Sequence, residues 1–151
     1  MFSIITDERL LDKQSFVLDA GVTGTLANGM VAHLASDGEV VYAATTNGIG
    51  VFYDFLSNIE PPSTANLVQL AGKQVTVVLG RFEALLTADL FDSGTAPTTP
   101  GAALYLDNVS GYVALSGTNK CGYFKGTETT RSVTGDVTLY RCQFNFPVPL
   151  A

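Results

Sequence analysis

The sequence has no tryptophan, one histidine and two cysteines among its 151 residues. A metal site at His33 would need Cys or carboxylate ligands at suitable spacing, but Asp37 and Glu39 are separated from it by a turn, so we expect a structural histidine at a strand surface. Cys121 and Cys142 are too few for a disulfide framework. A bond between them could form, but in a reducing compartment we expect two buried free thiols.

Charge is also sparse, since only 15% of the residues are charged where about a quarter is usual. The net charge is −6 and no basic stripe is present, so nucleic acid is not an expected partner. No run of 18 apolar residues occurs, and we therefore expect no membrane span. The first residues lack a basic segment followed by a long apolar run, which predicts no secretory signal and folding in a cytoplasm.

Patterns of catalytic residues are missing as well. There is no Gly-x-Ser-x-Gly turn, no calcium loop and no phosphate-binding Gly-Lys-Ser/Thr motif. The acidic residues that could form acid–base pairs are scattered, mostly at expected strand ends or turns: Glu83, Asp89, Asp92, Asp107 and Asp136. The sequence therefore predicts no enzyme, no cofactor and no metal.

What the chain has in abundance is short β-like runs that end on turn residues. Asp37-Gly38 between two apolar runs is a hairpin signal, and similar turns recur about every ten residues. This pattern predicts an all-β fold, a single small β-barrel or β-sandwich domain. The expected strands are 30–35, 39–45, 49–55, 74–79, 102–106, 112–115, 120–124 and 136–146.

Some segments are less clear. Residues 81–92 fit a helical face and an alternating strand equally well, and their β surroundings favour the strand. Segments 57–66 and 92–101 are rich in proline and small polar residues and predict loops. Residues 125–135 are polar and Thr-rich, and we assign them no strand.

Three regions follow from this pattern: an extended N-terminal arm over 1–20, a β-barrel body over 21–146 and an extended C-terminal tail over 147–151. Apolar residues in the arm, in the strand at 49–55 and in the Pro-rich tail are candidate partner contacts, because apolar extended segments gain more from a neighbour than from water. These candidates are Ile4, Ile5, Leu10, Leu11, Phe52, Phe55, Pro147, Val148, Pro149 and Leu150.

The order of the runs resembles the capsid decoration proteins of tailed bacteriophages, also called cement proteins. Gly48-Ile-Gly-Val51 is similar to the family's Gly-Ile/Val-Gly-Val segment, and Pro100 to Tyr105 is similar to its Pro-Gly-x-x-Leu-Tyr element. The similarity runs over roughly residues 24–125, with Asp37-Gly38 and Ser110-Gly-Tyr-Val113 at matching places.

The resemblance implies a structural virion protein on the outer surface of a capsid. Such a protein binds the major capsid protein, stabilises the shell by bridging neighbouring capsid subunits, and forms a homo-oligomer, with a trimer suspected. Two alternatives stay open: another phage β-structure protein, such as a tail-tube, neck or fibre component, and a carbohydrate-binding β-sandwich.

Overall fold

The computed structural model describes residues 2–22, 25–42, 47–53, 64–66, 72–107 and 111–148. These residues form strands and three single-turn 3-10 helices, which confirms the predicted all-β class. Within the described ranges, no helix is long and apolar enough to cross a membrane. The 3-10 helices are η1 (Glu8–Leu10), η2 (Ala88–Leu90) and η3 (Asp92–Gly94).

The strands are β1 (Phe2–Ile4), β2 (Asp12–Val17), β3 (Thr25–Ala27), β4 (Val31–Leu34), β5 (Val40–Val41), β6 (Gly48–Phe52), β7 (Thr64–Asn66), β8 (Gln74–Leu79), β9 (Arg81–Leu86), β10 (Ala103–Leu106), β11 (Val113–Ala114), β12 (Lys120–Ser132) and β13 (Gly135–Asn145).

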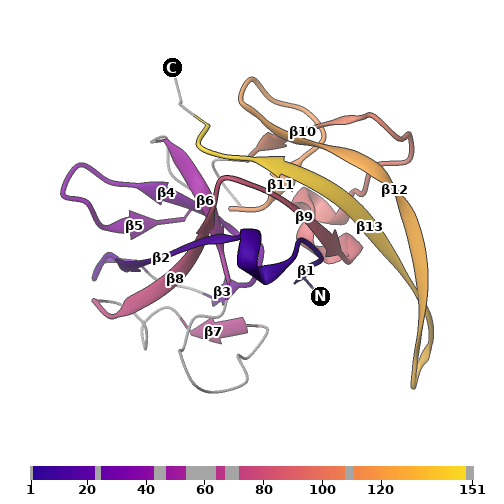
Figure 1. The fold of residues 1–151 in the computed structure, drawn as a ribbon, viewed down its shortest axis with the longest axis horizontal. Coiled ribbons are helices and arrows are strands. Elements are labelled where there is room, and N and C mark those ends of the chain that lie inside the picture. Colours follow the sequence, from indigo (N-terminus) through magenta and orange to yellow (C-terminus); the bar gives the residue numbers. More distant parts are fainter. Residues whose placement is uncertain are drawn as a thin grey trace.

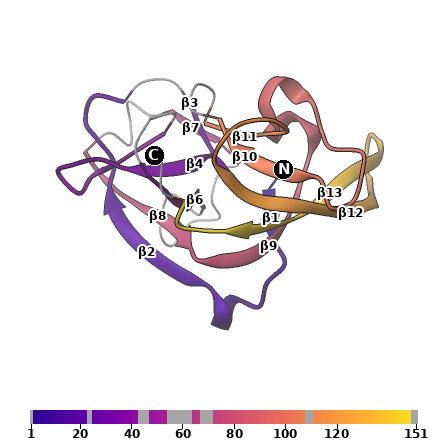
Figure 2. The same cartoon turned by 90° about the horizontal axis from the view of Figure 1, so that it is seen from above.

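Two antiparallel sheets make up most of the molecule (Figures 1 and 2). The larger has the order β1-β9-β13-β12-β10-β11, and the second has the order β2-β8-β6-β4-β5. A small pair, β3-β7, completes the fold. The large hydrophobic core draws residues from both sheets, for example Phe52 and Val77 from one and Phe82 and Phe144 from the other.

The two sheets are joined at one corner by two described stretches of chain that lie side by side. β8 and β9 are separated only by Gly80, whose φ of +73° is a conformation that glycine adopts without strain. β1 pairs antiparallel with β9, and β2 pairs antiparallel with β8. Residues 2–17 therefore run beside the β8–β9 segment in the opposite direction and pass from one sheet to the other with it. The expected N-terminal arm is therefore extended but is not a separate arm, because it supplies one strand to each sheet.

The five-stranded sheet curls into a half-barrel. Its edge strands β2 and β5 approach each other just after β2, where Leu18 and Val40 form a parallel bridge. The N–H of Asp19 donates to the Val40 carbonyl at 3.0 Å. Leu18 and Val40 are both fully buried, so apolar packing accompanies the closure of this seam.

The start of the expected C-terminal tail is also built into the body. The Phe146 N–H donates to the Gly80 carbonyl at 2.9 Å, and Val148 bridges to Gly48 of β6. Val148 is buried at 6% exposure, while Pro147 is exposed. Residues 147 and 148 thus connect the end of the first sheet to the second, and residues 149–151 lie outside the described residues.

Most expected strands are confirmed, with shifted ends. The ambiguous segment 81–92 begins as strand β9 and continues into the turns η2 and η3. Strands also occur where none was expected. β1, β2 and β3 precede residue 30, β7 lies in the predicted loop 57–66, and the Thr-rich segment 125–135 lies largely in β12, which continues to Ser132. Phe55 and residues 43–45, predicted as strand, lie outside the described ranges.

The two cysteines and the single histidine are buried in the core. Cys121 and Cys142 are both free and fully buried, as predicted, on the neighbouring strands β12 and β13. Burial raises the pKa of both thiols to about 12, and for Cys142 the charge of a Cys121 thiolate adds to the effect. His33 is also fully buried in β4, which corrects the expectation that it lies at a strand surface.

Candidate protein-interaction site

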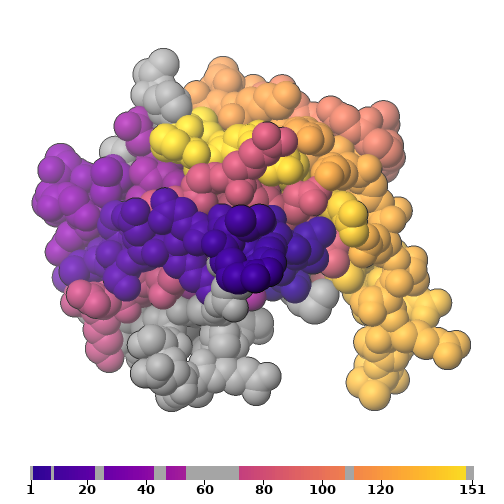
Figure 3. All heavy atoms as spheres, in the orientation of Figure 1, coloured from indigo at the N-terminus to yellow at the C-terminus, as the bar shows by residue number. Residues whose placement is uncertain are grey.

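The β12–β13 hairpin projects from the body and is the most prominent surface feature (Figures 1 and 3). β12 pairs with β10 only up to Tyr123, and β13 pairs with β9 only from Tyr140 onward. Between these points the two strands pair with each other alone, down to Ser132 opposite Gly135. Seven pairs lie beyond Phe124, and the last five, from Glu128–Leu139 to Ser132–Gly135, have no third described strand beside them. Five pairs correspond to about 15 Å of two-stranded ribbon at about 3.3 Å per residue.

Local sequence explains where this hairpin leaves the sheet. The register shifts between Phe124 and Gly126, so Lys125 is an extra residue, and such a bulge bends a strand away from its neighbours. β-Branched threonines then favour extended backbone through the segment, and Thr129 lies opposite Thr138. The threonines were visible in the sequence, but without an apolar face they did not predict a strand.

The hairpin ends in a two-residue turn, Val133-Thr134. The Ser132 hydroxyl donates to the Gly135 carbonyl at 2.9 Å and accepts from the Thr134 N–H at 3.2 Å, which fixes the turn. Val133 at the tip is fully exposed. An exposed apolar side chain at the end of a structured turn is available for contact with another molecule.

None of the residues from 125 to 138 is buried. Three ion pairs fix the hairpin instead: Lys125 with Glu83 of β9, Arg141 with Glu128, and Arg131 with Asp136 at 3.8 Å. All six side chains are exposed or partly exposed, so each pair contributes about 1 kcal/mol at most. The hairpin therefore adds much surface and little stability to the isolated chain.

An apolar groove of about 310 Å³ lies where β2, β6 and β8 meet the C-terminal segment. Among the described residues, Asp12 is the only ionisable side chain in its wall, and Gly80 forms part of it. The apolar side chains in its wall are Phe16, Leu34, Ile49, Leu79, Phe146 and Pro147. The groove can bury a small apolar side chain, while Asp12 favours a cation beside it.

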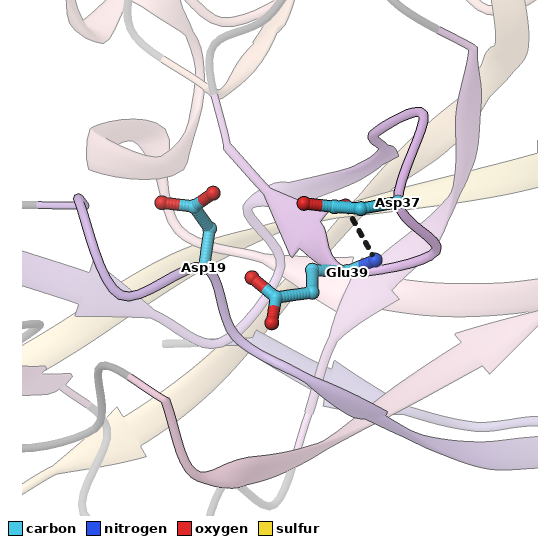
Figure 4. Close-up of side chains that lie close together, drawn as sticks. All are labelled: Asp19, Asp37 and Glu39. Atoms are coloured by element: carbon cyan, nitrogen blue, oxygen red, sulfur yellow. Dashed lines mark hydrogen bonds between the residues drawn. The ribbon is translucent and has the colours of Figure 1, made fainter.

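Three carboxylates gather at the barrel seam (Figure 4). Oxygens of Asp19, Asp37 and Glu39 lie within 4.8 Å of one another. Asp37 Oδ1 accepts from the Glu39 N–H at 3.0 Å, and Asp19 Oδ1 accepts from the Gly21 N–H at 2.6 Å. These are ordinary turn bonds, and with the Leu18–Val40 bridge they account for the cluster, so we assign it no ligand.

The predicted contact residues are placed differently from one another. Phe52 is fully buried and Val148 nearly so, which corrects the expectation that they face a partner. Ile5 and Leu10 are exposed, at 38% and 75%, while Ile4 and Leu11 pack partly against the core. Pro147 is exposed and lines the groove. Phe55, Pro149 and Leu150 lie outside the described residues.

Comparison with known proteins adds no family to this description. No family model matches the chain, and no match to a curated protein or a solved structure was found.

Proposed function

We propose that the chain is a capsid decoration protein of a tailed bacteriophage. It binds the outer surface of the capsid, where the major capsid protein is its partner, and stabilises the shell by bridging neighbouring capsid subunits. In this proposal the protein folds in the host cytoplasm, acts as a homo-oligomer, and has no catalytic role or cofactor.

The observation that carries this proposal is the β12–β13 hairpin. A bare two-stranded ribbon is marginally stable in water, yet this one extends five pairs beyond its last pairing with β9 and ends on exposed Val133. From Lys125 to Thr138 the ribbon has no buried residue, and a projecting segment of this kind can serve as a contact arm to a neighbouring protein. The order of turns and apolar runs, which resembles the decoration proteins, supplies the identity of the assembly.

Composition supports the same proposal. Charged residues are few and net negative, which suits a protein that contacts other proteins and stays apart from DNA. On a capsid the same contact is repeated at many symmetry-related positions. If several copies are joined, modest single contacts add up through avidity, so no single large interface is required.

The test is cosedimentation of the purified chain with undecorated expanded heads, with unexpanded heads as the control. We expect saturable binding to expanded heads and a higher melting temperature of the shell. A matched variant shortens the hairpin by replacing Thr129–Thr138 with Asn-Gly, which joins Glu128 to its partner Leu139. This variant should keep its fold and bind heads more weakly. Absence of binding by the wild-type chain would contradict the proposal.

A second candidate is a tail-tube, neck or fibre component, because the same hairpin could join subunits into rings or tubes. Electron microscopy of the chain alone distinguishes the two, since tubes formed without heads would favour the tail component. The carbohydrate-binding alternative has less support. Among the described residues, the exposed large apolar side chains are Ile5, Leu10, Leu115 and Val133, and none offers an aromatic ring for stacking on a sugar.

A further inference from the structure

We propose that copies of this chain associate head to tail, with the tip of the β12–β13 hairpin of one copy bound in the apolar groove of the next. The occupant of the groove is the Val133-Thr134 turn of a second copy. This inference deepens the proposed function by naming the hairpin's partner, but it stands on features of the chain alone and its test needs no capsid.

The tip and the groove have matching sizes and chemistry. Val133 is fully exposed and lies at the end of a narrow two-residue turn, so it can enter a cleft without the rest of the ribbon. The groove measures about 310 Å³ and is walled by apolar side chains such as Phe16, Ile49 and Leu79. Burying an exposed valine in such a groove removes apolar surface from water on both copies.

Opposite charges beside the tip and in the groove wall also favour this contact. Arg131 stands beside the tip with its side chain 93% exposed, and its contact with Asp136 spans 3.8 Å with both groups in water. Asp12, an exposed residue, supplies the one charge in the groove wall. A tip seated in the groove can therefore place the guanidinium of Arg131 near the carboxylate of Asp12.

The net charge of the hairpin is compatible with this contact. Residues 126–141, beyond the bulge, have two basic and two acidic side chains and no net charge, whereas the whole chain carries −6. A neutral hairpin can meet the acidic body of another copy without the repulsion that opposes contacts between two bodies.

The placement of the two features makes the contact intermolecular. The hairpin projects on the opposite side of the molecule from β2 and β4, whose residues contribute to the groove (Figures 1 and 2). The tip therefore cannot bind its own groove. An interface between two different surface patches is heterologous, and it generates a closed ring when the rotation closes, such as the suspected trimer, or an open filament when it does not.

The first experiment measures mass by sedimentation velocity over a range of concentrations. We expect the wild-type chain to form species larger than the monomer. Val133→Asp places a charge on the tip at a fully exposed position, so it should fold normally and sediment as a monomer. Thr138→Asp adds the same charge to an exposed site on the stem of the hairpin and should assemble like the wild type.

Mixing two defective copies tests the head-to-tail geometry. Asp12→Arg opposes Arg131 at the groove, and Leu34→Lys is a second groove variant that places a positive charge in its wall. Each groove variant alone, like Val133→Asp alone, should be monomeric or at least tenfold weaker in self-association. A mixture of Val133→Asp with a groove variant should form heterodimers that grow no further. The one intact tip and the one intact groove of each pair bind each other, and only a defective tip and a defective groove are left over.

A monomeric wild-type chain at millimolar concentration would overturn the inference, as would normal assembly of Val133→Asp. Failure of the mixture to form heterodimers would exclude a tip-in-groove contact. These outcomes are separable from the proposed function. If the wild-type chain binds heads but never self-associates, this inference and the proposed homo-oligomer fail while the capsid assignment stands. If it self-associates but does not bind heads, only the capsid assignment fails.

Discussion

Val148 and Gly48 exchange two backbone hydrogen bonds across the two sheets. The Gly48 N–H donates to the Val148 carbonyl at 3.0 Å, and the Val148 N–H donates to the Gly48 carbonyl at 2.7 Å. Val148 is also 6% exposed, so both its backbone and its side chain are used within the chain. The segment expected to reach a neighbour is thus, at this residue, part of the fold.

We expect Val148→Asp to lower the free energy of unfolding by about 1–3 kcal/mol, because a carboxylate would replace a buried apolar side chain. The segment after Phe146 should also become a protease site, since local release of the chain end avoids burying the charge. Urea denaturation and limited proteolysis measure both effects. Asn145→Asp adds the same charge at an exposed site and should change neither. Equal effects of the two substitutions would show that Val148 does not hold the segment.

The barrel seam gives a second prediction. Leu18 is fully buried where β2 meets β5, so Leu18→Ala should lower the free energy of unfolding by about 2–5 kcal/mol through lost burial and a cavity. The control is Leu10→Ala, at a side chain that is 75% exposed, which should stay within about 0.5 kcal/mol of the wild type. Chemical denaturation of both variants is the measurement. A small effect at Leu18 would mean that the seam can open without cost.

The close approach of the β12 and β13 backbones at Gly122 gives a third prediction. A Cβ at Gly122 would overlap the carbonyl oxygen of Gln143 on β13, and backbone cannot move aside as a side chain can. Gly122→Ala should therefore lower the free energy of unfolding by at least about 2 kcal/mol. Gly21→Ala is the control, since its Cβ would meet only the end of the Asp19 side chain. If thermal unfolding shows similar losses for both variants, β12 and β13 are not held as closely as described.

The buried thiols give a prediction about alkaline pH. Cys121 and Cys142 have pKa values of about 12 in the folded chain, against an ordinary value of 9.0. Between these values the unfolded chain loses thiol protons that the folded chain keeps. Stability should therefore be unaffected by the thiols below pH 9 and fall as the pH rises from 9 towards 12, by at most about 1.4 kcal/mol per pH unit for each thiol.

Urea unfolding between pH 7 and 10.5 measures this dependence. The double variant Cys121→Ala, Cys142→Ala should show a flatter decline than the wild type above pH 9, even though cavities lower its stability at every pH. Parallel curves for the two proteins would contradict the assigned burial of the thiols.

The shortened hairpin gives a last prediction, on stability alone. Replacing Thr129–Thr138 with Asn-Gly removes no buried side chain, and four residues are lost from each strand, so the alternation of the ladder is kept. We expect the melting temperature to change by no more than about 4 °C, which corresponds to about 1 kcal/mol in a chain of this size. A larger fall in a thermal scan would show that the hairpin supports the body.

Much of the fold follows from local pattern. Strand β8 is found at its predicted bounds because Val75 and Val77 alternate with Gln74 and Thr76, and the apolar run continues through Val78 to Leu79. β12 shows the limit of that reasoning. Its outer half has no apolar face, and its alternating Thr residues become informative only when the partner strand is known.

The candidate site could be predicted less well, because it depends on residues far apart in the chain. The groove combines Phe16, Leu34, Leu79 and Phe146, which come from four separate strands or their ends. Asp19 meets Asp37 and Glu39 only because the bridge between Leu18 and Val40 closes the half-barrel. The spacing of residues along the chain does not predict which distant residues come into contact.

The sequence by itself therefore determined the β class, the turns and the buried free thiols, since these depend on alternation, glycine and residue size at neighbouring positions. Only the tertiary structure decided that residues 2–17 and Val148 belong to the sheets, that Phe52 is internal, and that an exposed hairpin and an apolar groove lie on opposite sides of the chain. The physical reason is that strand pairing is non-local: which edges meet is settled by backbone hydrogen bonds and shared burial across the whole core.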